Sequence, residues 1–178
     1  MIRAAARALR RFVRAEDGSA TVEFSIVFLP MFAMLFTAVE LGMINIRHST
    51  LERAMDLTVR DIRLGTGAAP QHNQIKNMIC LRAGFINDCD NSLRLEMIPL
   101  NPRAWAGTPA TPDCTDQSQP VAPVRSFTNG IDNELMFLRA CAKLDPVFPN
   151  WGLGDALIKD AAGQYALIAT AIFVQEPR

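Results

Sequence analysis

The longest apolar stretch of the chain lies close to its N-terminus. Residues 22–46 contain only two charges, Glu23 and Glu40, over about 25 positions, whereas roughly 20 apolar residues suffice to span a bilayer as a helix. We therefore predict a membrane-spanning helix. Pro30 lies inside it and cannot donate a hydrogen bond to Ile26, so a kink or local melting is expected there. Glu40 follows Glu23 by about 25 Å of helix, and we expect it to be solvated at the opposite membrane surface.

Beyond the apolar stretch the pattern becomes that of an amphipathic helix. Apolar positions recur every three or four residues and alternate with charged ones, and Gly65 and Gly67 then supply a stop. The sequence thus predicts one helix over residues 19–64, transmembrane to about residue 46 and amphipathic afterwards. The side chains expected on its buried face are Leu51, Ala54, Met55, Thr58, Val59 and Ile62.

Three later segments have the pattern of strands, at residues 93–100, 134–144 and 164–174. In the second, apolar residues share one face while Arg139 and Lys143 lie on the other, which predicts a half-buried strand. The third is apolar on both faces, so we expect it to be central or covered. A second short helix is expected over residues 75–85, and the proline-rich residues 99–125 read as an irregular loop. The fold class predicted is α+β, with the long helix packed on a small antiparallel sheet of about three strands.

The charges before the apolar stretch predict its orientation. The first 18 residues contain five arginines, opposed only by Glu16 and Asp17, and the positive-inside rule places that end in the cytoplasm. Residues 65–178 would then form one modest domain outside the cytoplasm. An ordinary signal peptide is the competing interpretation, but its apolar core is about 7 to 15 residues long and is followed by a small-residue cleavage site. Here the apolar segment is longer and no A-x-A site follows it.

A short motif joins the basic segment to the apolar helix. Gly18 is followed by Ser-Ala-Thr-Val, then Glu23 and Phe24, directly before the hydrophobic run. This junction resembles the processing site of type IV prepilins, and it is most similar to that of the TadE-like minor pilins, or pseudopilins, of the tight-adherence (Tad, Flp) pilus. Residues 40–42, 63–65 and 174–177 also look TadE-like. Major Flp pilins usually have Tyr where Phe24 stands and are much shorter, which favours a minor subunit.

The resemblance implies a pilin-like fold and a processing step. Residues 1–18 would be a basic prepilin leader, and a prepilin peptidase would cut between Gly18 and Ser19. Glu23 would then lie near the new ammonium group of Ser19, and the Glu23 of one subunit could pair with the ammonium group of a neighbour, with Phe24 beside it. Two buried charges that satisfy each other are tolerated, so the pair would fix one axial register. The alternative is that Glu23 only favours the helix dipole in the first turn.

Four cysteines, Cys80, Cys89, Cys114 and Cys141, lie in the part predicted to be outside the cytoplasm. An even number in a small domain of an oxidising compartment favours two disulfides. Three pairings are possible, and we favour Cys80 with Cys89 and Cys114 with Cys141. No C-x-x-C pair accompanies His48 or His72, so neither a metal nor another cofactor is predicted.

The remaining composition excludes some classes of function. Lys and Arg total 18, as do Asp and Glu, so the basic surface of a nucleic-acid-binding protein is not expected. No phosphate loop, nucleophile elbow or zinc-hydrolase motif indicates an enzyme.

The resemblance predicts a minor pilin or pseudopilin that assembles or primes an adhesive Tad/Flp pilus. The alternative is a single-pass, membrane-anchored periplasmic accessory protein of a pilus or secretion machine that does not enter the filament. Expected partners are the prepilin peptidase, the major Flp pilin and other minor pilins, the assembly platform of the inner membrane and the lipid bilayer. The expected location is the inner membrane, with the C-terminal domain in the periplasm or on the surface pilus.

Overall fold

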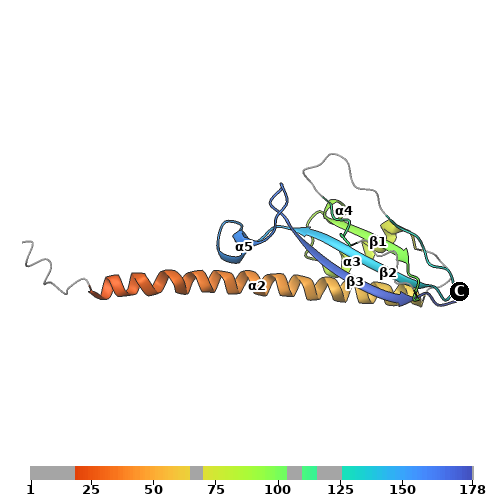
Figure 1. Ribbon diagram of the computed structural model, residues 1–178, viewed down its shortest axis with the longest axis horizontal. Helices are drawn as coiled ribbons and strands as arrows, with labels where there is room; N and C mark the ends of the chain where they lie inside the picture. The colour runs from red at the N-terminus through yellow and green to blue at the C-terminus, as the bar shows by residue number, and fades with distance from the viewer. Residues whose placement is uncertain (1–18, 65–69, 104–109, 116–125, 178) are drawn as a thin grey trace, which may run out of the picture.

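A computed structural model describes residues 19–64, 70–103, 110–115 and 126–177. The basic segment with Gly18, the two glycines after residue 64 and most of the proline-rich loop lie outside the described residues. Within the described part, Figure 1 shows one long helix with a small sheet packed on its second half. This arrangement confirms the predicted α+β fold with a three-stranded antiparallel sheet.

The long helix α2 spans Ser19–Arg63 and has two different halves (Figure 1). In the second half, the side chains predicted to face the core are all buried: Leu51, Ala54, Met55, Thr58, Val59 and Ile62. The first half extends away from the domain with most of its apolar side chains exposed. The 3.6-residue repeat therefore marks the part of the helix that has a sheet to pack against.

The helix passes through Pro30 without a break in its helical structure, so the expected local melting is not seen. A proline removes one backbone hydrogen bond, and the bonds on either side of it are enough to keep the segment helical. A kink at Pro30 stays a prediction for the helix in a bilayer.

The sheet has the order β1-β2-β3, with β1 at Leu93–Pro99, β2 at Leu135–Leu144 and β3 at Tyr165–Val174. Both pairings are antiparallel. Leu95, Ala140 and Ala169 face one another across the three strands and belong to the core. Residues 126–128 pair with the outer edge of β1 through Met97, which leaves less of that edge open.

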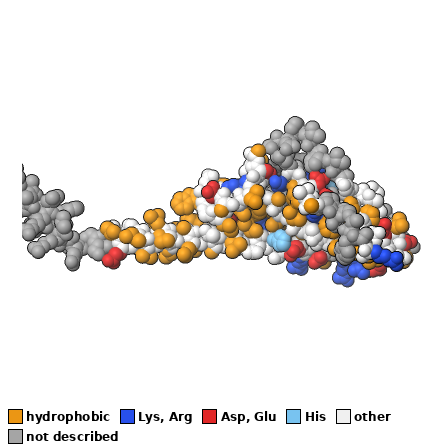
Figure 2. Space-filling view, viewed as in Figure 1, with side chains coloured by type: hydrophobic (Ala, Val, Ile, Leu, Met, Phe, Trp, Pro, Cys, Tyr) orange, Lys and Arg blue, Asp and Glu red, His pale blue; other side chains and the backbone are white. Residues whose placement is uncertain are grey.

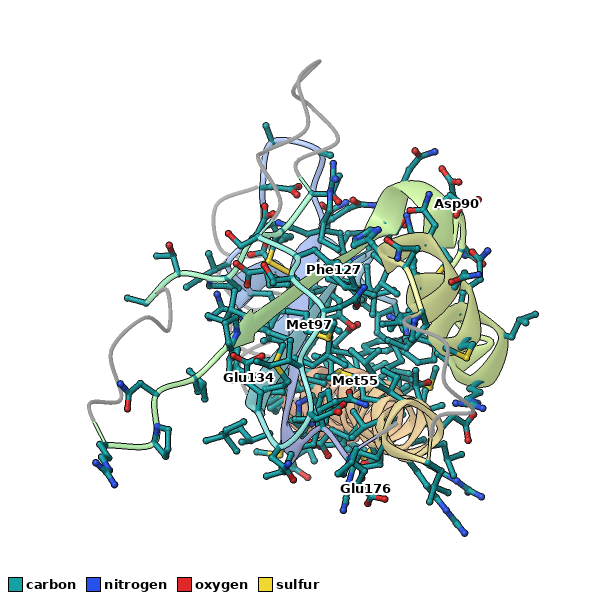
Figure 3. All side chains as sticks on the ribbon, turned by 90° about the vertical axis from the view of Figure 1, so that its right-hand side faces the viewer. Met55, Asp90, Met97, Phe127, Glu134 and Glu176 are labelled. Carbon is teal, nitrogen blue, oxygen red and sulfur yellow. A yellow bond between two sulfur atoms is a disulfide. The ribbon has the colours of Figure 1, made fainter. Side chains whose placement is uncertain are left out.

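The described part of the domain contains three further helices: α3 at His72–Ala83, α4 at Cys89–Ser92 and α5 at Gly152–Ala156. Helix α3 corresponds to the second helix expected from the sequence. It lies beside α2 and buries Ile75 and Ile79 in the common core. The end-on view of Figure 3 shows Met55 of α2 and Met97 of β1 in this interior. The single core therefore lies between the two longer helices and one face of the sheet.

The exposure of β2 and β3 is the reverse of what their sequences predict. Strand β2 is buried on both faces, although one face contains Arg139. Strand β3 is the edge strand, and its outer face exposes Ile168, Ile172 and Val174. The reason for the first difference is that residues 110–115 cover the outer face of β2, where Thr111 accepts a hydrogen bond from Arg139 at 2.9 Å.

Candidate functional site

The first half of α2 exposes more large apolar side chains than any other element among the described residues. Phe24 is 62% exposed and Met34 is 74% exposed, and Figure 2 shows hydrophobic side chains along this half up to the domain. By length and composition, α2 can cross a membrane, and its most apolar window buries nothing inside the protein. Such a surface requires lipid or other protein around it.

Four phenylalanines stack along this half, each four residues from the next. The ring centroids of Phe24 and Phe28 are 5.0 Å apart, and those of Phe28 and Phe32 are 4.2 Å apart. The series continues through Phe36, whose centroid lies 4.9 Å from that of Phe148 in the distant loop before α5. The apolar surface of the helix thus continues onto the domain.

The predicted processing and register residues lie at the free end of this helix. Ser19 is the first residue of α2, and Glu23 and Phe24 are exposed one turn later. Four residues of helix correspond to about 6 Å of rise, so the backbone nitrogen of Ser19 and Glu23 lie on adjacent turns. Gly18 lies outside the described residues, and the cut beside it stays a prediction.

Glu40 differs from the expectation that it is solvated at a membrane surface: its side chain is fully buried (0% exposed). Its two carboxylate oxygens accept hydrogen bonds from the backbone N–H groups of Val147, at 3.1 Å, and Phe148, at 2.8 Å. Burial of a carboxylate is tolerated when its hydrogen bonds are made. Glu40 therefore anchors a loop more than a hundred residues away, a role for which the local sequence contains no signal.

That loop, residues 145–159, contains α5 and packs on the middle of α2 (Figure 1). Gly152 has a left-handed backbone with φ of 54°, and a Cβ atom there would lie 2.7 Å from the hydroxyl oxygen of Thr37. A Cβ atom on Gly154 would lie 2.3 Å from the carbonyl oxygen of Phe148. Both glycines are therefore required by close contacts, one with α2 and one within the loop.

Several other polar groups of this loop are also paired. The ammonium group of Lys159 donates to the carbonyl oxygens of Pro149, at 2.8 Å, and Gly154, at 2.9 Å. At the start of the loop, Arg47 of α2 donates to the carbonyl oxygen of Asp145 at 2.9 Å. The loop is thus held to α2 at two levels, near Phe36 and near Arg47.

The cysteines are joined as favoured from the sequence. Cys80 of α3 is bonded to Cys89 of α4, and Cys114 of the covering segment is bonded to Cys141 of β2. The second bond fastens residues 110–115 over the outer face of the sheet.

Arg139 and Lys143 each form an ion pair on that outer face. Arg139 and Glu96 are cross-strand partners with both side chains buried, and their closest nitrogen and oxygen are 2.5 Å apart. Lys143 contacts Asp160 at 2.9 Å. Burial by itself would raise the pKa of Asp160, but hydrogen bonds from Lys143 and from the backbone of Gln164 and Ala162, with the charge of Lys143, outweigh it and lower that pKa. The surrounding contacts account for these charges as structural groups.

The part of the chain that the structure describes contains no group of three or more His, Cys, Asp or Glu side chains that could hold a metal ion. The exposed apolar half of α2, with the loop at residues 145–159 packed on it, is a candidate surface for contact with lipid or protein.

Comparison with known proteins adds one finding. Residues 18–60 match the family model of the TadE-like proteins. The matched segment begins at the glycine of the predicted processing site and ends in the buried half of α2. No curated protein and no solved structure matched the chain.

Proposed function

Starting from a chain that is TadE-like over residues 18–60, and so associated with the Tad pilus system, we propose that this protein is a minor pilin or pseudopilin of a Tad/Flp pilus. A prepilin peptidase cuts it after Gly18, and the mature protein takes part in assembling or priming the filament. The observation that carries this proposal is the exposed apolar half of α2, because the helix begins at Ser19, directly after the expected cut.

A helix with such an apolar half can be surrounded first by lipid and then by other pilin helices. In the membrane, lipid covers its apolar half, and the basic segment keeps the N-terminus in the cytoplasm. In a filament, the apolar helices of neighbouring subunits would replace the lipid. The domain that follows would lie in the periplasm before assembly, where its disulfides can form.

The first test is processing. We expect co-expression of the full chain with a Tad prepilin peptidase to yield a shortened protein whose N-terminal residue, identified by mass spectrometry, is Ser19. Gly18→Leu should block the cut, whereas Ala8→Leu, a similar enlargement inside the leader, should leave it unchanged. An uncut chain in the presence of a peptidase that processes the major pilin would overturn the proposal.

The second test separates a filament subunit from a membrane-anchored accessory protein. We expect the processed chain in pili sheared from cells, whereas an accessory protein would stay in the membrane fraction. Glu23→Ala should still be cut, because the scissile bond is unchanged, but it should be depleted from sheared pili. Thr21→Ala, a similar truncation half a turn earlier, is the matched control. Normal incorporation of the Glu23→Ala protein would refute the register role of Glu23.

A further inference from the structure

The loop at residues 145–159 exposes apolar side chains beside the membrane-spanning half of α2. Trp151 is 60% exposed and Ile158 is 95% exposed, and the Trp151 ring lies 6.2 Å from that of Phe36. We propose that this loop contacts the membrane. It would lie among the lipid headgroups on the side of the bilayer opposite the cytoplasm and would set how close the domain sits to the membrane. The proposal rests on the proposed function, because it requires α2 to be inserted in a membrane.

The distance along α2 supports this placement. From Ser19 to Phe36 the helix rises about 25 Å, and from Ser19 to Glu40 it rises about 32 Å. The hydrocarbon core of a bilayer is about 30 Å thick. When the first turn of α2 lies at the cytoplasmic interface, the loop therefore lies at the opposite interface. The spanning segment would then end near Glu40, about one and a half turns before the limit of residue 46 expected from the sequence.

The hydrogen bonds of the loop are suited to that depth. An irregular backbone near hydrocarbon must have its polar groups satisfied within the protein, because little water is available. Glu40 accepts from the N–H groups of Val147 and Phe148, and Lys159 donates to two carbonyl oxygens. These hydrogen bonds give the buried carboxylate of Glu40 a reason to lie at the end of the apolar half of α2.

The side chains indicate lipid as the occupant of this surface. Tryptophan is enriched at membrane interfaces, where its ring lies among the headgroups. Val147, Trp151 and Ile158 are exposed on the loop, and Trp151 lies beside Phe36 on the apolar half of α2 that lipid covers in the inserted protein. Arg47 and Lys159 donate to carbonyl oxygens of the loop, so the contact would depend on aromatic and aliphatic groups more than on charge.

Tryptophan fluorescence of the full chain in phosphatidylcholine vesicles tests the proposal. The chain has two tryptophans, so Trp105→Phe leaves Trp151 as the only one. Two reference variants are made in a chain that lacks both natural tryptophans, Trp105→Phe/Trp151→Phe. Leu29→Trp places a tryptophan in the apolar half of α2, and Leu81→Trp places one at an exposed position of α3. Lipids brominated near the glycerol backbone or near the chain ends report the depth of each tryptophan.

We expect a blue-shifted emission from Trp151 and a larger loss of emission with the shallow bromines than with the deep ones. If Trp151 instead shows the emission and acrylamide quenching of the Leu81→Trp variant, while brominated lipid still quenches Leu29→Trp, the loop does not contact the membrane. That result would overturn the present proposal but leave the membrane anchor intact. Loss of lipid quenching in Leu29→Trp as well would overturn both. A blue-shifted Trp151 that neither bromine quenches would mean that protein covers the loop, and this also contradicts the proposal.

Discussion

Oε2 of Glu40 lies 2.8 Å from the backbone nitrogen of Phe148, although the two residues are 108 positions apart in the chain. The contact ties the loop before α5 to the middle of the long helix. Glu40→Ala should leave the N–H groups of Val147 and Phe148 without their acceptor. Each buried N–H group left unsatisfied should cost about 1–3 kcal/mol of stability.

The lost hydrogen bonds should appear as faster amide hydrogen exchange at residues 147 and 148 in the detergent-solubilised protein. Exchange in β2 should change less. Glu40→Gln retains one acceptor oxygen and should give an intermediate effect. Unchanged exchange in the Glu40→Ala protein would show that the carboxylate does not hold the loop.

The close contacts at the glycines of the loop predict that no larger residue fits at Gly154 of α5. Gly154→Ala places a Cβ atom 2.3 Å from a backbone carbonyl oxygen, which no side-chain movement can relieve, so the loop must shift. We expect the unfolding free energy to fall by about 1–3 kcal/mol, as for other overpacked sites. Gly42→Ala is the control, because a Cβ atom there meets nothing within 4 Å. Alanine is about 1 kcal/mol more favourable than glycine inside a helix, so this variant should not lose stability. Urea unfolding of both variants measures the contrast, and equal stabilities would contradict it.

The buried pair of Arg139 and Glu96 predicts an asymmetry between single and double substitution. Arg139→Met leaves the Glu96 carboxylate buried without its cation and should destabilise the domain by about 3–5 kcal/mol. The double variant Arg139→Met/Glu96→Leu removes both charges and should recover most of that loss. Thermal unfolding of the unsubstituted protein, of Arg139→Met and Glu96→Leu singly, and of the double variant completes a double-mutant cycle. A double variant less stable than the single one would refute the interpretation.

The lowered pKa of Asp160 predicts a pH dependence of stability. Because the folded-state pKa lies below the ordinary value of 3.8, the unfolded chain takes up the proton first as the pH falls. The stabilisation is therefore complete above that value and is lost as the pH drops toward the folded pKa. Asp160→Asn should reduce stability near neutral pH and flatten the acid limb of the profile. An unchanged slope between about pH 5 and about pH 3 would show that other carboxyl groups dominate.

The periodic parts of the fold were predictable from the sequence. The repeat of Leu51, Met55 and Ile62 predicted the buried face of α2, and the strand pattern located β1, β2 and β3 within a residue or two. These elements follow from local spacing, which a single segment carries by itself. The favoured pairing of the cysteines likewise agrees with the two disulfides of the structure.

The parts that depended on distant partners were not predictable. Arg139 predicted a solvated face for β2, but its partner Glu96 lies 43 residues away and the segment that covers both is irregular. Glu40 looked like an interfacial acid because its hydrogen-bond donors are backbone groups of a remote loop, and any residue except proline carries such a donor. Strand β3 is apolar on both faces, so its sequence could not say which face had a neighbour.

The way in which α2 joins the domain has a mechanical consequence. All four cysteines lie outside α2, and the chain leaves the helix only after Arg63, at the end opposite its exposed half. Tension applied to the exposed half along the helix axis would therefore load the packing of Leu51, Met55 and Ile62 simultaneously, in shear. Contacts that must yield together resist more than contacts that separate one after another, because their small attractions add. The domain should thus be mechanically strongest along the direction in which its own helix points.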